Sequence, residues 1–112
     1  AYLTSDIYDM ILNSTDVRRE YKITFKAPIN YYDDSLSGMD VLVDGVIDLL
    51  CKTSDTYVIV DYKTDNVDLI EELKDRYKVQ LDLYEIAVKD VLKAKKVRKF
   101  IYSIKLNKFI EV

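Results

Sequence analysis

The stretch from Thr56 to Thr64, TYVIVDYKT, decides the fold of this 112-residue chain. Its run from Tyr57 to Val60 is apolar on both faces of an extended strand, which is typical of a central strand covered on both sides. Asp40 to Leu50 is the strand expected before it, and the six residues from Cys51 to Thr56 suit a hairpin turn. We therefore expect two antiparallel neighbours at the centre of a β-sheet.

The flanking segments supply the remaining layers. Alternating side chains predict a strand over Val17 to Lys26, with Val17, Arg19, Tyr21, Ile23 and Phe25 on one face. A loop is expected from Ala27 to Gly38, a fourth strand over Val97 to Leu106, and a short fifth after Asn107, over Phe109 to Val112. Helical spacing predicts a helix over residues 2–14 and a long one starting at Asp65 or Asn66. This α-β-β-β-α-β order predicts an α/β fold, a three-layer sandwich with a central mixed β-sheet.

The long helix has the clearest apolar stripe. Asp65, Asn66 and Asp68 are suitable cap or first-turn residues at its start. The stripe consists of Leu69, Leu73, Tyr77, Leu81, Tyr84, Val88 and Val91, with help from Ile70 and Ala87. We expect this side of the helix to pack on the sheet.

Composition excludes several classes of protein. A length of 112 residues suits one domain, because single domains typically contain about 100–150 residues. No window approaches the roughly 20 apolar residues that span a bilayer, so no membrane association is expected. The single cysteine excludes an internal disulfide and a cysteine-based zinc or iron–sulfur site, and the absence of histidine excludes a Ser-His-Asp triad within this chain. Carboxylate, lysine and tyrosine remain for chemistry.

The net charge of −3 hides an uneven distribution. Lys93 to Lys108 contains seven basic residues and no acid, whereas the preceding part of the chain is acidic. Such a stretch could face phosphates, or it could be a solvated helix end followed by a strand with exposed lysines.

Three ionisable residues occupy positions that should be covered. On the strand from Thr56 to Thr64, Asp61 and Lys63 share a face with Tyr57 and Ile59. On the preceding strand, Asp48 shares its face with Leu42, Val46 and Leu50. A turn centred on Ser54-Asp55 would place Asp48 opposite Asp61, whereas a slip of the register would place it opposite Ile59.

Two neighbouring carboxylates repel each other unless a cation lies between them. A hard divalent ion bound by carboxylates, a main-chain carbonyl and water would relieve the repulsion, polarise a phosphodiester and lower the pKa of bound water. Lys63 could then orient the attacking water or balance charge in the transition state. The alternative is a structural salt-bridge cluster in which Lys63 neutralises Asp48 or Asp61.

A second polar pair interrupts the stripe of the long helix. Gln80 and Tyr84 are four positions apart, so they share one face of the helix. A glutamine that faces a sheet needs hydrogen-bond partners. The pair is either a satisfied amide with a core tyrosine or part of the same site.

Together these motifs resemble the PD-(D/E)xK nuclease superfamily, and most closely its RecB-like branch. That branch carries G-x-x-D, D-Y-K-T and Q-x-x-x-Y in this order, which here are Gly45 to Asp48, Asp61 to Thr64 and Gln80 to Tyr84. The residues around these motifs resemble the C-terminal nuclease domains of the AddA (RexA) family of helicase–nuclease subunits. The family core is itself αβββαβ. We therefore expect one nuclease domain over 1–112, with an N-terminal helix in 1–16, a core in 17–112, and a larger parent chain.

The resemblance implies roles for particular residues. Asp48 and Asp61 would ligate Mg²⁺, for which Mn²⁺ could substitute, with the carbonyl of Tyr62 as a further ligand. Lys63 would be the catalytic lysine. Gln80 and Tyr84 would support the site and contact DNA, Glu20 would match an acidic residue that often precedes the core, and Arg76 could contact phosphate.

The resemblance also implies a setting. It indicates an exonuclease in the bacterial cytoplasm, joined to a helicase in the same parent chain and paired with an AddB (RexB)-type subunit. Its partners would be double-strand DNA ends and their single-stranded product, processed for recombinational repair. RecB-like nucleases usually have an upstream histidine ligand, which this chain lacks, and Cys51 alone cannot supply the iron–sulfur cluster of AddB relatives. The competing hypotheses are a non-catalytic module that docks a partner or DNA, and a stand-alone exonuclease of the same superfamily.

Overall fold

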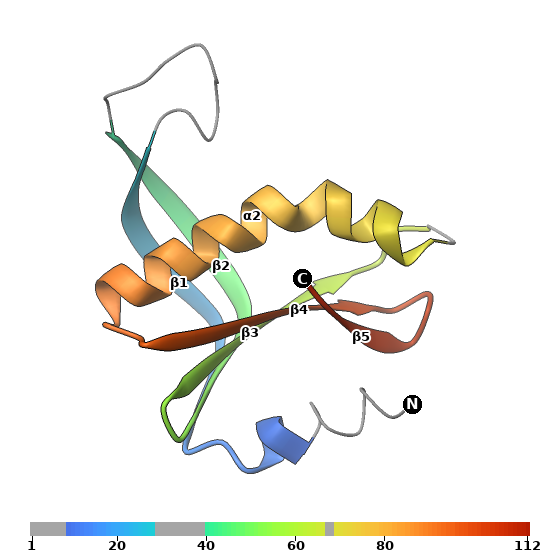
Figure 1. The fold of residues 1–112 in the computed structure, drawn as a ribbon, viewed down its shortest axis with the longest axis horizontal. Helices are drawn as coiled ribbons and strands as arrows, with labels where there is room; N and C mark the ends of the chain where they lie inside the picture. Colours follow the sequence, from blue (N-terminus) through green and yellow to red (C-terminus); the bar gives the residue numbers. More distant parts are fainter. Residues whose placement is uncertain (1–8, 29–39, 67–68) are drawn as a thin grey trace.

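A five-stranded mixed sheet forms the centre of the molecule (Figure 1). The computed structural model describes residues 9–28, 40–66 and 69–112. The strands follow the order β1-β2-β3-β4-β5, and β3 and β4 are parallel whereas the other neighbours are antiparallel. Their bounds are Asp16–Pro28 (β1), Asp40–Thr53 (β2), Thr56–Lys63 (β3), Lys96–Ser103 (β4) and Lys108–Glu111 (β5), and helix α2 spans Ile70–Val91.

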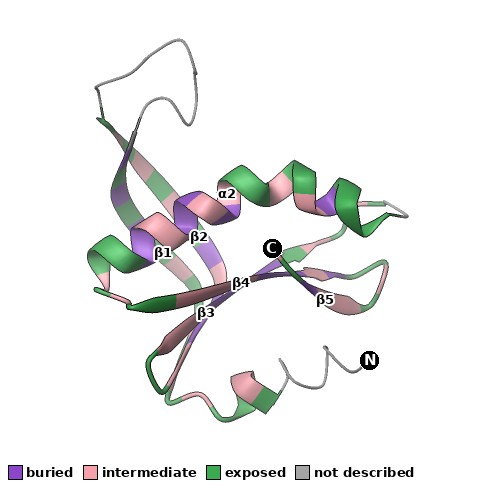
Figure 2. Cartoon of the chain, in the orientation of Figure 1, coloured by how far each residue is buried: buried purple, intermediate pink, exposed green. Residues whose placement is uncertain are grey.

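The two faces of the sheet have separate cores. Helix α2 covers one face, and the helical residues 9–12 lie at the other (Figure 1). Met10 and Ile11 from this helical turn pack on a buried cluster in which Cys51 is fully covered. Figure 2 shows buried positions along the middle strands and on the sheet-facing side of α2. The described residues therefore form three layers, and the predicted α/β sandwich with a mixed sheet is confirmed.

The hairpin between β2 and β3 has the predicted register but a tighter turn. Thr53 pairs with Thr56, so Ser54 and Asp55 alone form the turn, in place of the six residues expected. Ser54 adopts a φ of 52°, in the left-handed region that such turns use. The register continues regularly up to the pair Leu49–Val60, where the ladder between the two strands ends.

Alternation of side chains fails in β1 and β2 at one common level. Glu20 adopts a φ of 50°, and Ile47 and Leu50 both pack beneath α2 although strict alternation would place them on opposite faces. The prediction that Asp48 shares a buried face with the even-numbered residues of β2 is therefore wrong, as is the inward position of the first residues of β1. Leu42, Val46, Val17 and Arg19 are exposed, whereas Leu50 is buried.

Helix α2 begins later than predicted. It starts at Ile70 with no side-chain cap, because its N-cap residue Leu69 has an apolar side chain, and the carboxylate of Asp65 instead accepts hydrogen bonds from Arg76 and Tyr77. Asp68 lies outside the described residues. The middle of the predicted stripe (Leu73, Leu81, Tyr84, Ala87, Val88) is buried, but its end positions Leu69, Ile70 and Val91 are exposed.

The remaining boundaries differ by a few residues. Ala27 and Pro28 extend β1 into the expected loop, whose other residues lie outside the described part, as do residues 1–8 of the expected first helix. β4 ends at Ser103, whose Oγ accepts a hydrogen bond from the N–H of Leu106, and Asn107 turns the chain with a φ of 51°. Among the described residues, no helix combines the length and apolar character needed to cross a membrane.

Candidate active site

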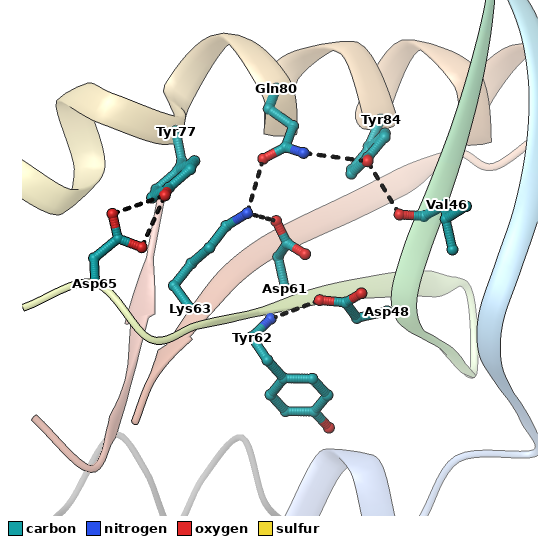
Figure 3. A network of polar contacts seen from close by, with 9 residues as sticks. All are labelled: Val46, Asp48, Asp61, Tyr62, Lys63, Asp65, Tyr77, Gln80 and Tyr84. Atoms are coloured by element: carbon teal, nitrogen blue, oxygen red, sulfur yellow. Dashed lines mark hydrogen bonds and ion pairs between the residues drawn. The ribbon is translucent and has the colours of Figure 1, made fainter. Parts of the chain in front are cut away.

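Asp61 and Lys63 lie side by side at the end of β3, on the face covered by α2 (Figure 3). The Nζ atom of Lys63 is 2.9 Å from Oδ2 of Asp61, and the two side chains are only 16% and 6% exposed. The strand period of two predicted this arrangement. A largely covered lysine and carboxylate therefore face the helix as a pair.

Asp48 approaches this pair from β2, just beyond the last regular rung between the strands. Its Oδ2 accepts a hydrogen bond of 2.9 Å from the backbone N–H of Tyr62. Burial and the neighbouring Asp48 carboxyl raise the pKa of Asp61 to about 6, although Lys63 acts in the opposite direction. The structure thus brings the two predicted carboxylates together, and their mutual repulsion is only partly offset.

Gln80 and Tyr84 connect the lysine to the other side of the site (Figure 3). The Lys63 ammonium donates to Oε1 of Gln80 at 3.2 Å, and Nε2 of Gln80 donates to the Tyr84 hydroxyl at 3.3 Å. The Tyr84 hydroxyl in turn donates to the carbonyl of Val46 at 3.0 Å. The glutamine therefore has partners on both sides, and it fixes the position of the Lys63 head group.

Gly45 allows Tyr84 to reach β2. A Cβ atom at Gly45 would lie 2.9 Å from Cε1 of the Tyr84 ring, closer than van der Waals contact permits. The sequence pattern contained this glycine as the first residue of G-x-x-D, but gave it no role. The absence of a side chain is what admits the tyrosine and, through it, the Gln80 amide.

Tyr77 and Asp65 lie beside Lys63, and neither residue was predicted to be part of the site. The Lys63 ammonium lies 4.0 Å from the centre of the Tyr77 ring, a cation–π contact. The Tyr77 hydroxyl donates to the Asp65 carboxylate at 2.8 Å. Tyr77 lies three residues before Gln80, so helical spacing could have indicated that both residues face Lys63.

Arg76 and Glu20 lie at the margins of the site. Arg76 pairs with Asp65 at 2.5 Å and with Glu72 at 3.3 Å. The hydrogen bond from Arg76, and to a smaller extent that from Tyr77, holds the pKa of Asp65 below its usual range. Glu20 is exposed and lines a cavity of about 500 Å³ together with Arg19, Asp48 and Tyr62. Among the described residues, neither of the two forms a hydrogen bond or ion pair with Asp61 or Lys63.

The two carboxylates suit a hard divalent cation. Oδ2 of Asp61 is buried and forms no well-directed hydrogen bond with the described residues. Its polar contact is the ion pair with the Lys63 ammonium at 2.9 Å. Within the described ranges no group of three or more His, Cys, Asp or Glu residues is placed to hold a metal. Among the described residues, Asp48 and Asp61 are the carboxylates that meet at this point, and a hard cation bound there would need carbonyl or water oxygens as further donors.

The stretch from Lys93 to Lys108 is not a uniform basic surface. Lys99 lies between Asp82 and Glu85, at 2.7 Å from each. Arg98 pairs with Glu111, and Lys96 lies 3.5 Å from Asp55. These pairs neutralise the middle of the stretch.

Known proteins resemble this chain along almost its whole length. Residues 4–111 match the sequence profile of the PD-(D/E)XK nuclease superfamily. The chain is 31% identical to the ATP-dependent helicase/nuclease A subunit of Exiguobacterium sibiricum and 34% identical to that of Ligilactobacillus salivarius, over 97% of its length in both cases. It spans only 10% and 9% of those two relatives.

A solved structure supports the fold alone. The crystal structure of SSO0001 aligns with a TM-score of 0.50 at 12% identity, over 99% of this chain and 48% of that one. The sequence profile confirms the motif resemblance independently of this likeness, and the chain belongs to the PD-(D/E)XK nuclease superfamily.

Proposed function

We propose that this chain is the nuclease domain of an ATP-dependent helicase–nuclease and hydrolyses DNA phosphodiesters with Mg²⁺. The observation that carries the proposal is the covered Asp61–Lys63 pair with the Asp48 carboxylate beside it. The names of the relatives support a helicase–nuclease parent. That parent would be a bacterial cytoplasmic exonuclease paired with an AddB-type subunit, with residues 1–112 as one domain within it.

The site residues divide the work between holding a cation and managing charge. Asp48, Asp61 and the Tyr62 carbonyl would hold Mg²⁺, or Mn²⁺ in its place. When bound, the ion supplies polarisation of the phosphodiester and a lower pKa for attacking water. Lys63 orients that water and balances the charge that develops on phosphate.

The helix residues position the lysine and the substrate. Gln80 accepts from the Lys63 ammonium, and the Tyr84 hydroxyl holds the Gln80 amide. Because this leaves little freedom at Nζ, the lysine stays aimed at the carboxylates. Gln80, Tyr84 and Arg76 would contact the DNA strand, with Arg76 released from its carboxylate partners on binding.

A structural cluster is the competing interpretation, and one observation favours it. The ammonium of Lys63 already contacts Asp61 at 2.9 Å, as it would in a simple ion pair. In that case neither carboxylate would bind metal, and the domain would serve only to dock DNA or a partner protein.

Titration calorimetry with Mn²⁺ separates the two. We expect the wild-type chain to bind the ion, and both Asp48→Ala and Asp61→Ala to abolish binding while remaining folded. Asp90→Ala, which removes an exposed carboxylate near the end of α2, should bind as the wild type does. Equal binding by all four proteins would show that the ion lies elsewhere, and the nuclease proposal would fail at this site.

Cleavage and salt dependence complete the test. We expect single-stranded DNA to be cut with Mg²⁺ by the wild type and not by Lys63→Ala. DNA affinity should fall as the salt concentration rises, because phosphate contacts release counterions. An affinity that is insensitive to salt would contradict contact with the DNA backbone.

A further inference from the structure

Arg19 differs from the other three arginines of this chain. Arg18 pairs with Asp16 at 3.0 Å, Arg76 with Asp65 at 2.5 Å and Arg98 with Glu111 at 2.9 Å. Arg19 is exposed and, within the part of the chain that the structure describes, its guanidinium forms no ion pair or hydrogen bond. An arginine kept clear of carboxylate partners is available to bind an anion.

The position of Arg19 is beside the candidate active site. It lines the cavity of about 500 Å³ with Glu20, Asp48 and Tyr62, a volume in the usual range for small-ligand sites. The left-handed backbone at Glu20 and the end of the β2–β3 ladder at Leu49–Val60 occur at this level of the sheet. The same cavity therefore reaches one of the two proposed metal ligands.

Tyr62 supplies an aromatic surface to this cavity. Its side chain is directed away from α2, on the opposite side of β3 from Asp61 and Lys63 (Figure 3). The residue is 47% exposed, and its ring meets Tyr102 edge to face, at 6.1 Å between centroids and an angle of 79°. Tyr62 is therefore both partly accessible and part of the cavity lining.

We propose that Arg19 and Tyr62 form a nucleotide subsite that holds the DNA strand next to the bond that is cut. The Arg19 guanidinium binds a backbone phosphate through its fork of N–H donors, and the Tyr62 ring stacks on the adjoining unpaired base. The inference rests on the proposed nuclease function and names two residues that position its substrate.

Charge in the cavity explains why the arginine is needed. Glu20 and Asp48 line the same space and repel a phosphate. Arg19 is the cation among the lining residues, so it offsets that repulsion at its own end of the cavity. The subsite therefore orients the strand, with phosphate towards Arg19 and base towards Tyr62.

The test is DNA binding without cleavage, measured by fluorescence anisotropy in EDTA. The probes are a labelled 12-nucleotide oligo-dT and a backbone of the same length without bases. We expect Arg19→Ala to weaken binding of both probes about 10-fold and to lower the salt slope by about one. Tyr62→Ala should weaken oligo-dT binding about 10-fold and leave binding of the base-free backbone unchanged.

Two matched controls keep the result specific. Arg18→Ala removes the neighbouring, carboxylate-paired arginine and should bind both probes as the wild type does. Tyr62→Phe keeps the ring and should retain oligo-dT binding, which a role of the hydroxyl would not allow. Circular dichroism melts of all variants verify that the fold is intact.

Three results would overturn the subsite. They are equal losses for Arg18→Ala and Arg19→Ala, a Tyr62→Ala loss that does not depend on bases, and no oligo-dT binding by the wild type. Cleavage by the wild type with normal DNA binding by Arg19→Ala would reject the subsite and leave the nuclease intact. Failure of Mn²⁺ binding and of cleavage, with the Arg19 effect present, would reject the nuclease and leave a DNA-binding surface.

Discussion

Two lysines lie between the sheet and helix α2, and they have opposite electrostatic settings. Lys63 and Lys99 have nearly equal side-chain exposure, 16% and 13%. Lys99 forms ion pairs with two carboxylates, Asp82 and Glu85, at 2.7 Å each, whereas Lys63 forms an ion pair with one carboxylate of the described residues, Asp61, at 2.9 Å. The depth of burial is shared, so the difference lies in how the charges are balanced.

At Lys99 the ion pairs outweigh burial. Burial acts to raise the pKa of Asp82 and of Glu85, but the surrounding lysines lower both values below their usual range. Burial likewise acts to lower the pKa of Lys99, and the two carboxylates raise it instead. This cluster is balanced without any further ion.

Beside Lys63, burial and the second carboxylate, Asp48, affect the pKa of Asp61 more strongly than the ion pair does. The pKa of Asp61 rises to about 6 in spite of the ammonium beside it. A cluster built for stability would resemble the one at Lys99. The excess of negative charge at Asp48 and Asp61 is instead what a divalent cation would balance.

The largest expected effect comes from removing each lysine in turn. Lys63→Met should lower DNA cleavage about 10²–10³-fold, because a charge-stabilising donor is lost from the site. Lys99→Met should leave cleavage unchanged and lower the free energy of unfolding by about 1–2 kcal/mol, because two carboxylates lose the cation that they share and keep only their more exposed partners Lys78 and Lys89. Cleavage rates and urea unfolding of the two variants check this. Equal losses of cleavage in both would remove the distinction between the clusters.

The next effect is a pH dependence of opposite sign at the two clusters. Because the folded-state pKa of Asp61 is above its unfolded value, the carboxyl favours folding most at low pH and loses that contribution as pH rises through about 6. Asp61→Asn should therefore gain stability relative to wild type between pH 4 and 7, by about 2–3 kcal/mol. Urea unfolding in EDTA measures it.

Asp82→Asn is the matched comparison for this pH series. The folded-state pKa of Asp82 is below its unfolded value, so its contribution to stability is present at neutral pH and is lost as pH falls. The variant should thus be less stable than wild type at pH 7, and the difference should shrink in acid. A parallel response of the two variants would contradict the contrast.

A smaller effect is expected from filling the space beside Tyr84. Gly45→Ala would place a Cβ 2.9 Å from the Tyr84 ring, and the shift should cost about 1–3 kcal/mol of stability. The cost should largely vanish in a Tyr84→Ala background, since the clashing ring is then absent. A double-mutant cycle by urea unfolding measures the coupling, and no coupling would mean that the clash is relieved elsewhere.

The smallest effect concerns one hydroxyl. Tyr84→Phe removes the donor to the Val46 carbonyl and the acceptor for Gln80, which should cost about 1 kcal/mol. Because the ring remains, Gly45 packing is retained. Thermal unfolding beside wild type checks the cost, and a loss as large as that of Gly45→Ala would show that the ring itself had moved.

Much of the sheet could be predicted from the sequence because its strands follow simple rules. The apolar run from Tyr57 to Val60 and the period of two placed Asp61 and Lys63 together, and the turn at Ser54-Asp55 placed the register. These features depend on local geometry alone. The pairing of Gln80 with Tyr84 followed in the same way from helical spacing.

The missed features depend on contacts between distant segments. Nothing local to Glu20 indicates its positive φ, which breaks the alternation that was extended to Arg19 and Asp48. The role of Gly45 becomes visible only when the Tyr84 ring is placed over it. Asp65 was expected at a helix start because aspartate is generally favoured as a helix cap. In the folded chain its carboxylate instead accepts hydrogen bonds from Arg76 and Tyr77.

The buried position of Cys51 has a practical consequence for kinetics. It is the only thiol of the chain, it lies at 0% exposure in the core against which Met10 and Ile11 pack, and burial raises its pKa. Because only an exposed thiolate reacts, a disulfide reagent can modify this residue only in molecules whose outer layer has opened. The rate of this reaction therefore measures how often the layer formed by Met10 and Ile11 opens, in a protein that carries no introduced substitution.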